Sequence, residues 1–119
     1  MLSEDYSTGK KNWKNYEKVQ FKSMAELLTW ISDDKRTFHL SRKVYDAVMD
    51  CLKDGIESVI VLTLVVNGDQ NSEIDVQIRK DNFQKILGAY SKKLIENEEY
   101  EILAKITPEI KKYGFEIWE

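Results

Sequence analysis

The segment from Ser58 to Val66 limits the fold more than any other part of this sequence. It is rich in β-branched side chains and carries apolar residues at both odd and even positions. This pattern predicts a central strand with both faces covered. Turn-forming residues follow at 67–72, and residues 73–79 then alternate between apolar and polar, which predicts a strand with one face in water. The two strands are therefore predicted to form an antiparallel hairpin.

Three segments have the apolar spacing of helices that pack on such a sheet. Their predicted N-caps are Ser23, Ser41 and Asp81, and Glu26 completes a capping box with Ser23. Gly55 supplies a left-handed stop for the second helix. The predicted helices cover residues 24–32, 42–53 and 82–96.

The remaining segments have weaker patterns. The end of the stretch 10–22 alternates as a short strand does, and residues 37–40 are predicted to be extended. Residues 100–106 are compatible with either a strand or a helix. A threonine–proline pair predicts a short helix over 107–113, because proline suits the first helical position. Residues 115–118 are predicted to form a closing strand.

The size and composition of the chain indicate one globular domain. Its 119 residues are 42% hydrophobic and 33% charged, which is too apolar for intrinsic disorder. A single domain is predicted over 1–119, with residues 1–9 frayed. The predicted fold class is α+β: a mostly antiparallel sheet with about three packed helices.

The sequence also predicts a cytoplasmic protein without a membrane segment. Its opening residues are acidic and lack the apolar stretch of a secretory signal. The longest apolar run, residues 59–66, is far shorter than the roughly 20 residues that span a bilayer. The lone cysteine, Cys51, suits a reducing compartment.

The charge of the chain is unevenly distributed. The net charge is −3, yet residues 10–43 hold nine basic and four acidic residues, whereas residues 44–119 hold nine basic and fifteen acidic residues. Lysines that alternate with aromatic residues can bind single-stranded nucleic acid, because cations contact phosphates while rings stack on bases. The predicted RNA-binding residues are Lys10, Lys11, Trp13, Lys14, Tyr16, Lys18, Arg42 and Lys43.

Two alternatives remain open for the charged segments. The aromatic residues Trp13, Tyr16 and Phe21 can instead pack a first strand onto the core, with the lysines protecting the edge of the sheet from aggregation. The acidic run Glu96, Glu98, Glu99 and Glu101 is typical of a solvated face, and it can also bind a basic protein partner.

The sequence offers little to an enzyme. The five glycines are isolated, so no phosphate-binding loop is present. His39 and Cys51 are the only histidine and cysteine, and they are predicted to lie on different elements. A nucleophile–base pair between them is less favoured than a locally satisfied histidine and a buried cysteine. We therefore predict no catalytic residue, no metal site and no cofactor.

In its size, its opening Gly9-Lys10-Lys11-Asn12-Trp13, and the stretches 37–43 and 59–68, the chain resembles the PrgU family. These are small cytoplasmic proteins encoded on pheromone-responsive conjugative plasmids of enterococci. The resemblance covers the whole chain. It implies a negative regulator that limits production of surface adhesins during conjugative induction and acts through RNA.

The resemblance also implies a fold similar to PUA-type RNA-binding barrels, and it carries over no catalytic residue. The patterns above predict four strands, or six if residues 100–106 and 115–118 are both extended. A barrel needs the higher number to close its edges.

Overall fold

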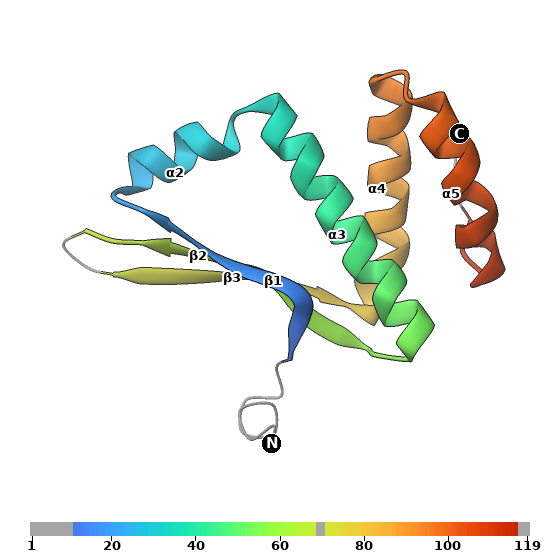
Figure 1. Ribbon diagram of the computed structural model, residues 1–119, viewed down its shortest axis with the longest axis horizontal. Helices are drawn as coiled ribbons and strands as arrows, with labels where there is room; N and C mark the ends of the chain where they lie inside the picture. The colour runs from blue at the N-terminus through green and yellow to red at the C-terminus, as the bar shows by residue number, and fades with distance from the viewer. Residues whose placement is uncertain (1–10, 69–70, 117–119) are drawn as a thin grey trace.

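The computed structural model describes residues 11–68 and 71–116. Along the chain, one strand is followed by two helices, a β-hairpin and two more helices (Figure 1). This arrangement confirms the α+β class. The elements are β1 (Asn12–Phe21), α2 (Met24–Ile31), α3 (Asp34–Asp54), β2 (Ser58–Val66), β3 (Ser72–Arg79), a 3₁₀ turn η1 (Lys80–Asn82), α4 (Phe83–Glu96) and α5 (Tyr100–Lys112).

The sheet has three strands in the order β1-β2-β3 and is open and mixed. The predicted hairpin is confirmed, because β2 and β3 pair antiparallel. However, β1 pairs parallel to β2, so the expectation of a mostly antiparallel sheet was wrong. The connection through α2 and α3 explains the difference, since a crossover of one or more helices returns the chain in the same direction.

The PUA-like barrel is not formed by the described residues. Residues 37–40 belong to α3 and residues 100–106 belong to α5, so both candidate strands are helical. Residues 115 and 116 are in no strand, and residues 117 and 118 lie outside the described ranges. The described strands therefore leave two open edges, at β1 and β3.

The predicted helices are confirmed in place, but three of their ends differ. Helix α3 begins at Asp34, and its N-cap Asp33 accepts hydrogen bonds from the backbone amides of Lys35 and Arg36 at 2.9 and 3.3 Å. Ser41, the predicted cap, lies inside this helix and donates to the carbonyl of Thr37. The predicted stop is confirmed, because Gly55 has a φ of 69°.

The other two differences concern the C-terminal helices. Asp81 lies in η1, and α4 begins two residues later. Pro108 does not open a helix, because it lies within α5. The proline leaves the carbonyl of Ala104 without its helical donor, and this residue is exposed to water.

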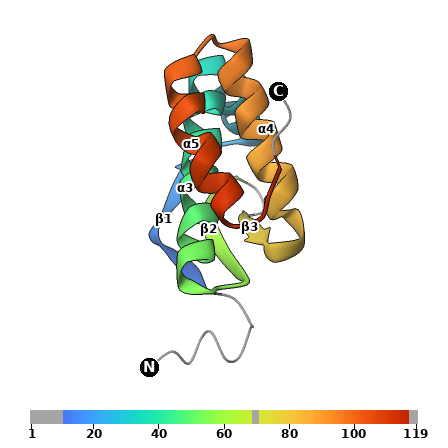
Figure 2. The same ribbon diagram turned by 90° about the vertical axis from the view of Figure 1, so that its right-hand side faces the viewer.

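Helices α2, α3 and α4 lie on one side of the sheet, and α5 packs on α4 (Figures 1 and 2). Leu62, Leu64 and Val66 of β2 belong to the core, and Val19 and Phe21 of β1 lie opposite the last two. Residues 59–66 are all buried and β2 is the central strand, as predicted, but the described helices cover only one of its faces. The two central helices, α3 and α4, close the core, with Tyr45 stacked on Tyr90 at 4.9 Å between ring centres.

The other face of the sheet is made from the alternate residues. There the hydroxyl of Tyr16 donates to Thr63 at 2.8 Å, and Thr63 donates to Asp75 at 2.8 Å. These hydrogen bonds connect one residue from each of the three strands, and they provide partners for the hydroxyl of the buried Thr63. None of the helices in the described residues is both long and apolar enough to cross a bilayer.

Candidate nucleic-acid interface

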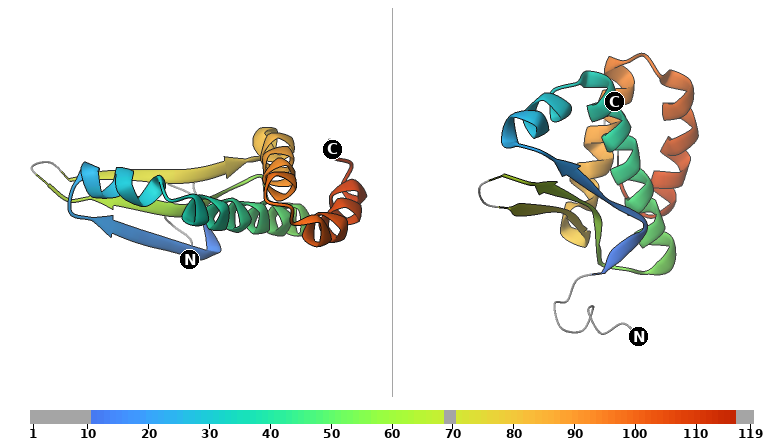
Figure 3. Two further views of the ribbon diagram at one scale, coloured as in Figure 1. Left: turned by 90° about the horizontal axis from the view of Figure 1, so that it is seen from above. Right: turned by 60° about the vertical axis from the view of Figure 1, so that its left-hand side comes forward.

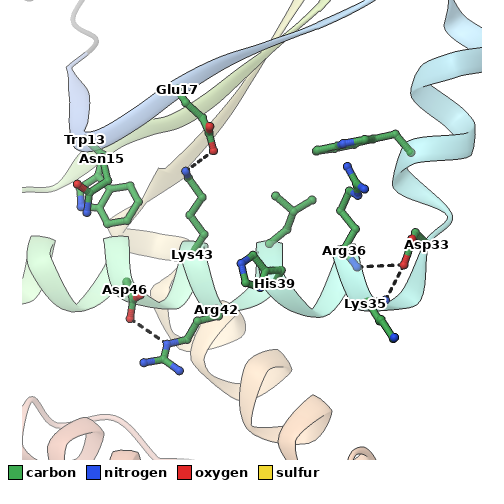
Figure 4. Close-up of a pocket in the computed structure, with 12 residues that line it drawn as sticks. Trp13, Asn15, Glu17, Asp33, Lys35, Arg36, His39, Arg42, Lys43 and Asp46 are labelled. Atoms are coloured by element: carbon green, nitrogen blue, oxygen red, sulfur yellow. Dashed lines mark hydrogen bonds and ion pairs between the residues drawn. The ribbon is translucent and has the colours of Figure 1, made fainter.

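A groove of about 730 Å³ lies between β1 and the first half of α3 (Figure 4). β1 supplies one wall and α3 the other, while the last turn of α2 closes one end. Because a helix exposes the same face at intervals of three and four residues, Arg36 and Lys43 point from α3 towards Trp30 and β1, whereas Lys35 and Arg42 line the outer rim and point away from β1 (Figure 4). The lining residues are Trp13, Asn15, Glu17, Trp30, Asp33, Lys35, Arg36, His39, Leu40, Arg42, Lys43 and Asp46.

The rim near α2 carries a cation stacked on an aromatic ring. The guanidinium carbon of Arg36 lies 4.9 Å from the ring centre of Trp30, within the range of a cation–π contact. Trp30 is itself held edge-on against Phe21 of β1, with ring centres 5.2 Å apart. The buried Phe21 thus fixes the indole, and the indole positions the guanidinium. A planar cation held at a groove rim can bind a phosphate or stack on a base.

Two of the cations that line the groove, Lys43 and Arg42, are already paired. Lys43 donates to Glu17 at 2.6 Å, and its ammonium lies 5.9 Å from the ring centre of Trp13. Arg42 donates to Asp46 at 3.3 Å. Burial alone would lower the pKa of Arg42, but the neighbouring Tyr90 and Asp46 raise it overall, so this guanidinium stays charged. A nucleic-acid phosphate entering the groove would compete with these two carboxylates.

The predicted RNA-binding residues do not form one patch. Trp13 is only 7% exposed, and its indole nitrogen donates to Asp50 at 2.7 Å. The carboxylate of Asp50 also lies 3.5 Å from the ammonium of Lys14. This part of the basic segment therefore packs β1 against α3, which is the edge-strand alternative raised by the sequence.

The rest of the predicted set is divided among other places. Tyr16 and Lys18 belong to the face of the sheet without helices, where Lys18 lies 3.9 Å from Glu73. Lys11 is exposed just before β1, and Lys10 lies outside the described residues. Of the predicted residues, the groove brings together only Trp13, Arg42 and Lys43.

Sequence reasoning missed Trp30, Lys35, Arg36 and His39. Residues 37–40 are predicted to be extended and the second helix to begin at residue 42, so the basic face of the first turns of α3 was not recognised. The missing signal is the aspartate at 33. If it is taken as the N-cap, Arg36, Leu40 and Lys43 fall at spacings of four and three on one helical face.

The two residues considered for catalysis, His39 and Cys51, are not brought together by the fold. His39 and Cys51 lie on the same helix, twelve residues or about 18 Å apart along its axis, so they do not form a pair. Burial, with smaller effects from Asp50 and Asp54, raises the pKa of Cys51 to about 11, which keeps the thiol protonated at neutral pH. Within residues 11–68 and 71–116, no group of three potential ligands is placed to hold a metal ion.

The buried Cys51 predicts a loss of stability in alkali. Its pKa is raised from 9.0 in an unfolded chain to about 11 in the fold. The neutral thiol therefore contributes its full stability below pH 9, and this contribution is lost as the pH rises from about 9 to about 11. Between about pH 9 and pH 10, we expect the free energy of unfolding to fall by on the order of 1 kcal/mol. Urea unfolding at both pH values, with a reducing agent present, measures this fall. Cys51→Ala lowers stability at neutral pH but should show a smaller fall in this interval; an equal fall would contradict the assignment.

A second charged surface lies at the turn between α4 and α5. Glu98 adopts a φ of 58°, which reverses the chain between the two helices. The surrounding residues Glu96, Glu99, Tyr100 and Glu101 are all exposed, and Tyr100 is 57% exposed. The acidic run therefore forms a projecting tip with an apolar ring at its centre.

Comparison with family models, curated proteins and solved structures gives no match to this chain. Proposals about function therefore depend on the residues and geometry described above, together with the resemblance seen in the sequence.

Proposed function

We propose that this protein is a cytoplasmic, non-enzymatic RNA-binding regulator, whose groove between β1 and α3 binds single-stranded RNA. The observation that carries the proposal is the stack of Arg36 on Trp30 at the rim of a groove that also holds Lys43 and has Lys35 and Arg42 on its outer edge. Cations beside fixed aromatic rings are the usual means of binding single strands.

The PrgU resemblance suggests the biological setting. Occupying a single-stranded region of a transcript needs no chemistry, and it is sufficient to block a ribosome. The proposed outcome is reduced production of plasmid-encoded adhesins. The excess of acidic residues outside the groove would repel RNA elsewhere on the protein and so direct it to this face.

The ion pair between Glu17 and Lys43 provides a specific test. Its carboxylate occupies the position that a phosphate oxygen would take, so Glu17→Gln should release the lysine for RNA. We expect this variant to bind a single-stranded RNA about three- to tenfold more tightly at about 50 mM salt, since an additional lysine–phosphate contact releases counterions. Fluorescence anisotropy with a labelled 12-mer of mixed sequence measures the affinity.

Glu101→Gln is the matched control, because it removes the same charge from an exposed residue in the first turn of α5, outside the groove. If both variants strengthen binding equally, the effect is one of net charge and the groove is not the site. If neither wild type nor Glu17→Gln binds RNA, the proposed function is wrong.

The acidic tip supports a second candidate, a module that binds a basic protein. Glu96, Glu98, Glu99 and Glu101 surround an exposed Tyr100 without a salt bridge from any described residue. Tyrosine at the centre of a charged rim is a frequent anchor of protein interfaces. Capture from cells with and without ribonuclease separates the two candidates: a partner that survives ribonuclease and is lost in Tyr100→Ala would favour the acidic tip.

A further inference from the structure

The outer edge of β3 is open. The sheet order places β3 at an edge, and no strand of the described residues pairs with its outer side. The strand has eight residues and contains no proline. Its pairing with β2 is continuous from Ser72 to Val76, which lie opposite Val66 to Leu62. Edges of this kind present unpaired amides and carbonyls that can pair with another chain.

The sequence of β3 is complementary to itself in one antiparallel register. If two copies meet with Val76 opposite Val76, then Glu73 lies opposite Arg79 and Ile74 lies opposite Ile78. Opposite charges then pair on one face of the combined sheet, and apolar residues pair on the other, twice over because the arrangement has twofold symmetry.

The neighbouring registers that keep the same faces together are less favourable. Centring the pair on Asp75 sets two carboxylates directly against each other. Centring it on Gln77 pairs Asp75 with Arg79, but it sets the apolar Ile74 opposite Lys80 and Glu73 opposite Asp81, beyond the end of the strand. The register at Val76 is the one that pairs opposite charges on one face and apolar residues with each other on the other face.

Exposed apolar side chains lie where this arrangement would cover them. Ile74 is 42% exposed although it belongs to the helix-covered face, opposite Leu64. It is near the turn between β2 and β3, at the end of the sheet where α2 lies (Figures 1 and 3). Met24, Leu28 and Ile31 of α2 are exposed by 43–56% and recur at helical spacing.

Antiparallel pairing would bring the helical end of the partner to this uncovered end. Helix α4 follows β3 directly through η1 and stands at the end of the sheet where Ile78 is buried (Figure 2). In the Val76 register, the partner's Ile78 lies opposite Ile74, so the partner's α4 would stand beside Ile74. Exposed apolar surface would thus be buried without any change of fold.

We propose that two copies of this chain join through β3 to form a continuous six-stranded sheet. The other edge is less suited to pairing, because β1 changes register between Asn12 and Glu17 and carries Lys14 and Lys18. The groove lies along β1, so it stays accessible in the dimer and is presented twice. The proposal does not depend on RNA binding.

Charge exchange tests the register. Sedimentation equilibrium of the full chain should show a reversible dimer. Glu73→Arg and Arg79→Glu should each raise the dimer dissociation constant at least about tenfold, because like charges then face each other, and the double variant should restore it. A monomer at all concentrations would overturn the proposal, as would singles that dimerise like wild type or a double variant that fails to recover.

Cysteine cross-linking measures the same register independently. In a Cys51→Ala background, Val76→Cys should form an intermolecular disulfide on mild oxidation, because directly opposed residues have Cα atoms about 4.5–5.5 Å apart. Ile74→Cys is the control, since its copies would be about 13 Å apart in this register. Equal cross-linking of the two variants, or cross-linking of residue 74 alone, would contradict the proposed pairing.

Discussion

Trp13→Ala is expected to lower the free energy of unfolding by about 3–5 kcal/mol, the cost of removing a buried aromatic ring. Trp13 is 7% exposed and part of the core, and its indole nitrogen donates to Asp50 at 2.7 Å. Truncation leaves a cavity between β1 and α3 and removes one donor from that carboxylate. Because domains of this size are stable by about 5–15 kcal/mol, the variant would lose a large fraction of its stability. Urea unfolding followed by circular dichroism measures the loss.

Trp13→Phe separates the ring from the hydrogen bond. It keeps most of the apolar volume and loses only the donor, and Asp50 retains Lys14 nearby at 3.5 Å. The expected cost is about 1–2 kcal/mol, since a single hydrogen bond contributes about that much and some packing is lost. An alanine variant as stable as wild type would show that the indole is not part of the core, and it would return Trp13 to the set of residues available for stacking on a base.

Some elements of the fold were predictable from the sequence and others were not. The hairpin was predicted because β2 and β3 differ in their apolar period, and each period follows directly from burial. The direction of β1 was not predictable in the same way, because it depends on how the chain crosses the sheet. The predicted second helix began at residue 42, eight residues too late, because Thr37, Phe38 and His39 have weak helical preference on their own. In the folded chain, capping by Asp33 and packing of Phe38 against Tyr90 override that preference.

The candidate site was less predictable than the fold for a related reason. A run of lysines and aromatic residues in one strand alternates between two faces, so neighbours in sequence separate in space. Lys14 and Lys18 are four residues apart and would share a face in a regular strand, but β1 changes register between Asn12 and Glu17, and the two lysines reach different acidic partners, Asp50 and Glu73. The residues that do share the groove come from three elements, and only the tertiary structure brings Trp30 and Arg36 to the same place as Lys43.

The double variant Lys35→Glu/Arg36→Glu is expected to weaken binding of single-stranded RNA by at least about 50-fold at about 50 mM salt. Each lysine– or arginine–phosphate contact adds about 0.7 to the slope of log affinity against log salt for a single strand. Losing two contacts therefore removes about 1.4 from the slope and nearly two decades of affinity at this salt, before repulsion by the new carboxylates is counted. Anisotropy titrations at several salt concentrations give both quantities.

Lys85→Glu/Lys92→Glu is the matched control, because it makes the same change of charge at two exposed lysines of α4, a helix that contributes no residue to the groove. It should leave the salt slope nearly unchanged and weaken binding only through the overall field of the protein. Both double variants replace exposed side chains, so their unfolding curves should stay close to wild type. If the two lose affinity equally, binding follows net charge and not the groove. If only the groove variant loses it, together with its salt slope, the phosphates lie along the first turns of α3, where the guanidinium of Arg36 is held on Trp30.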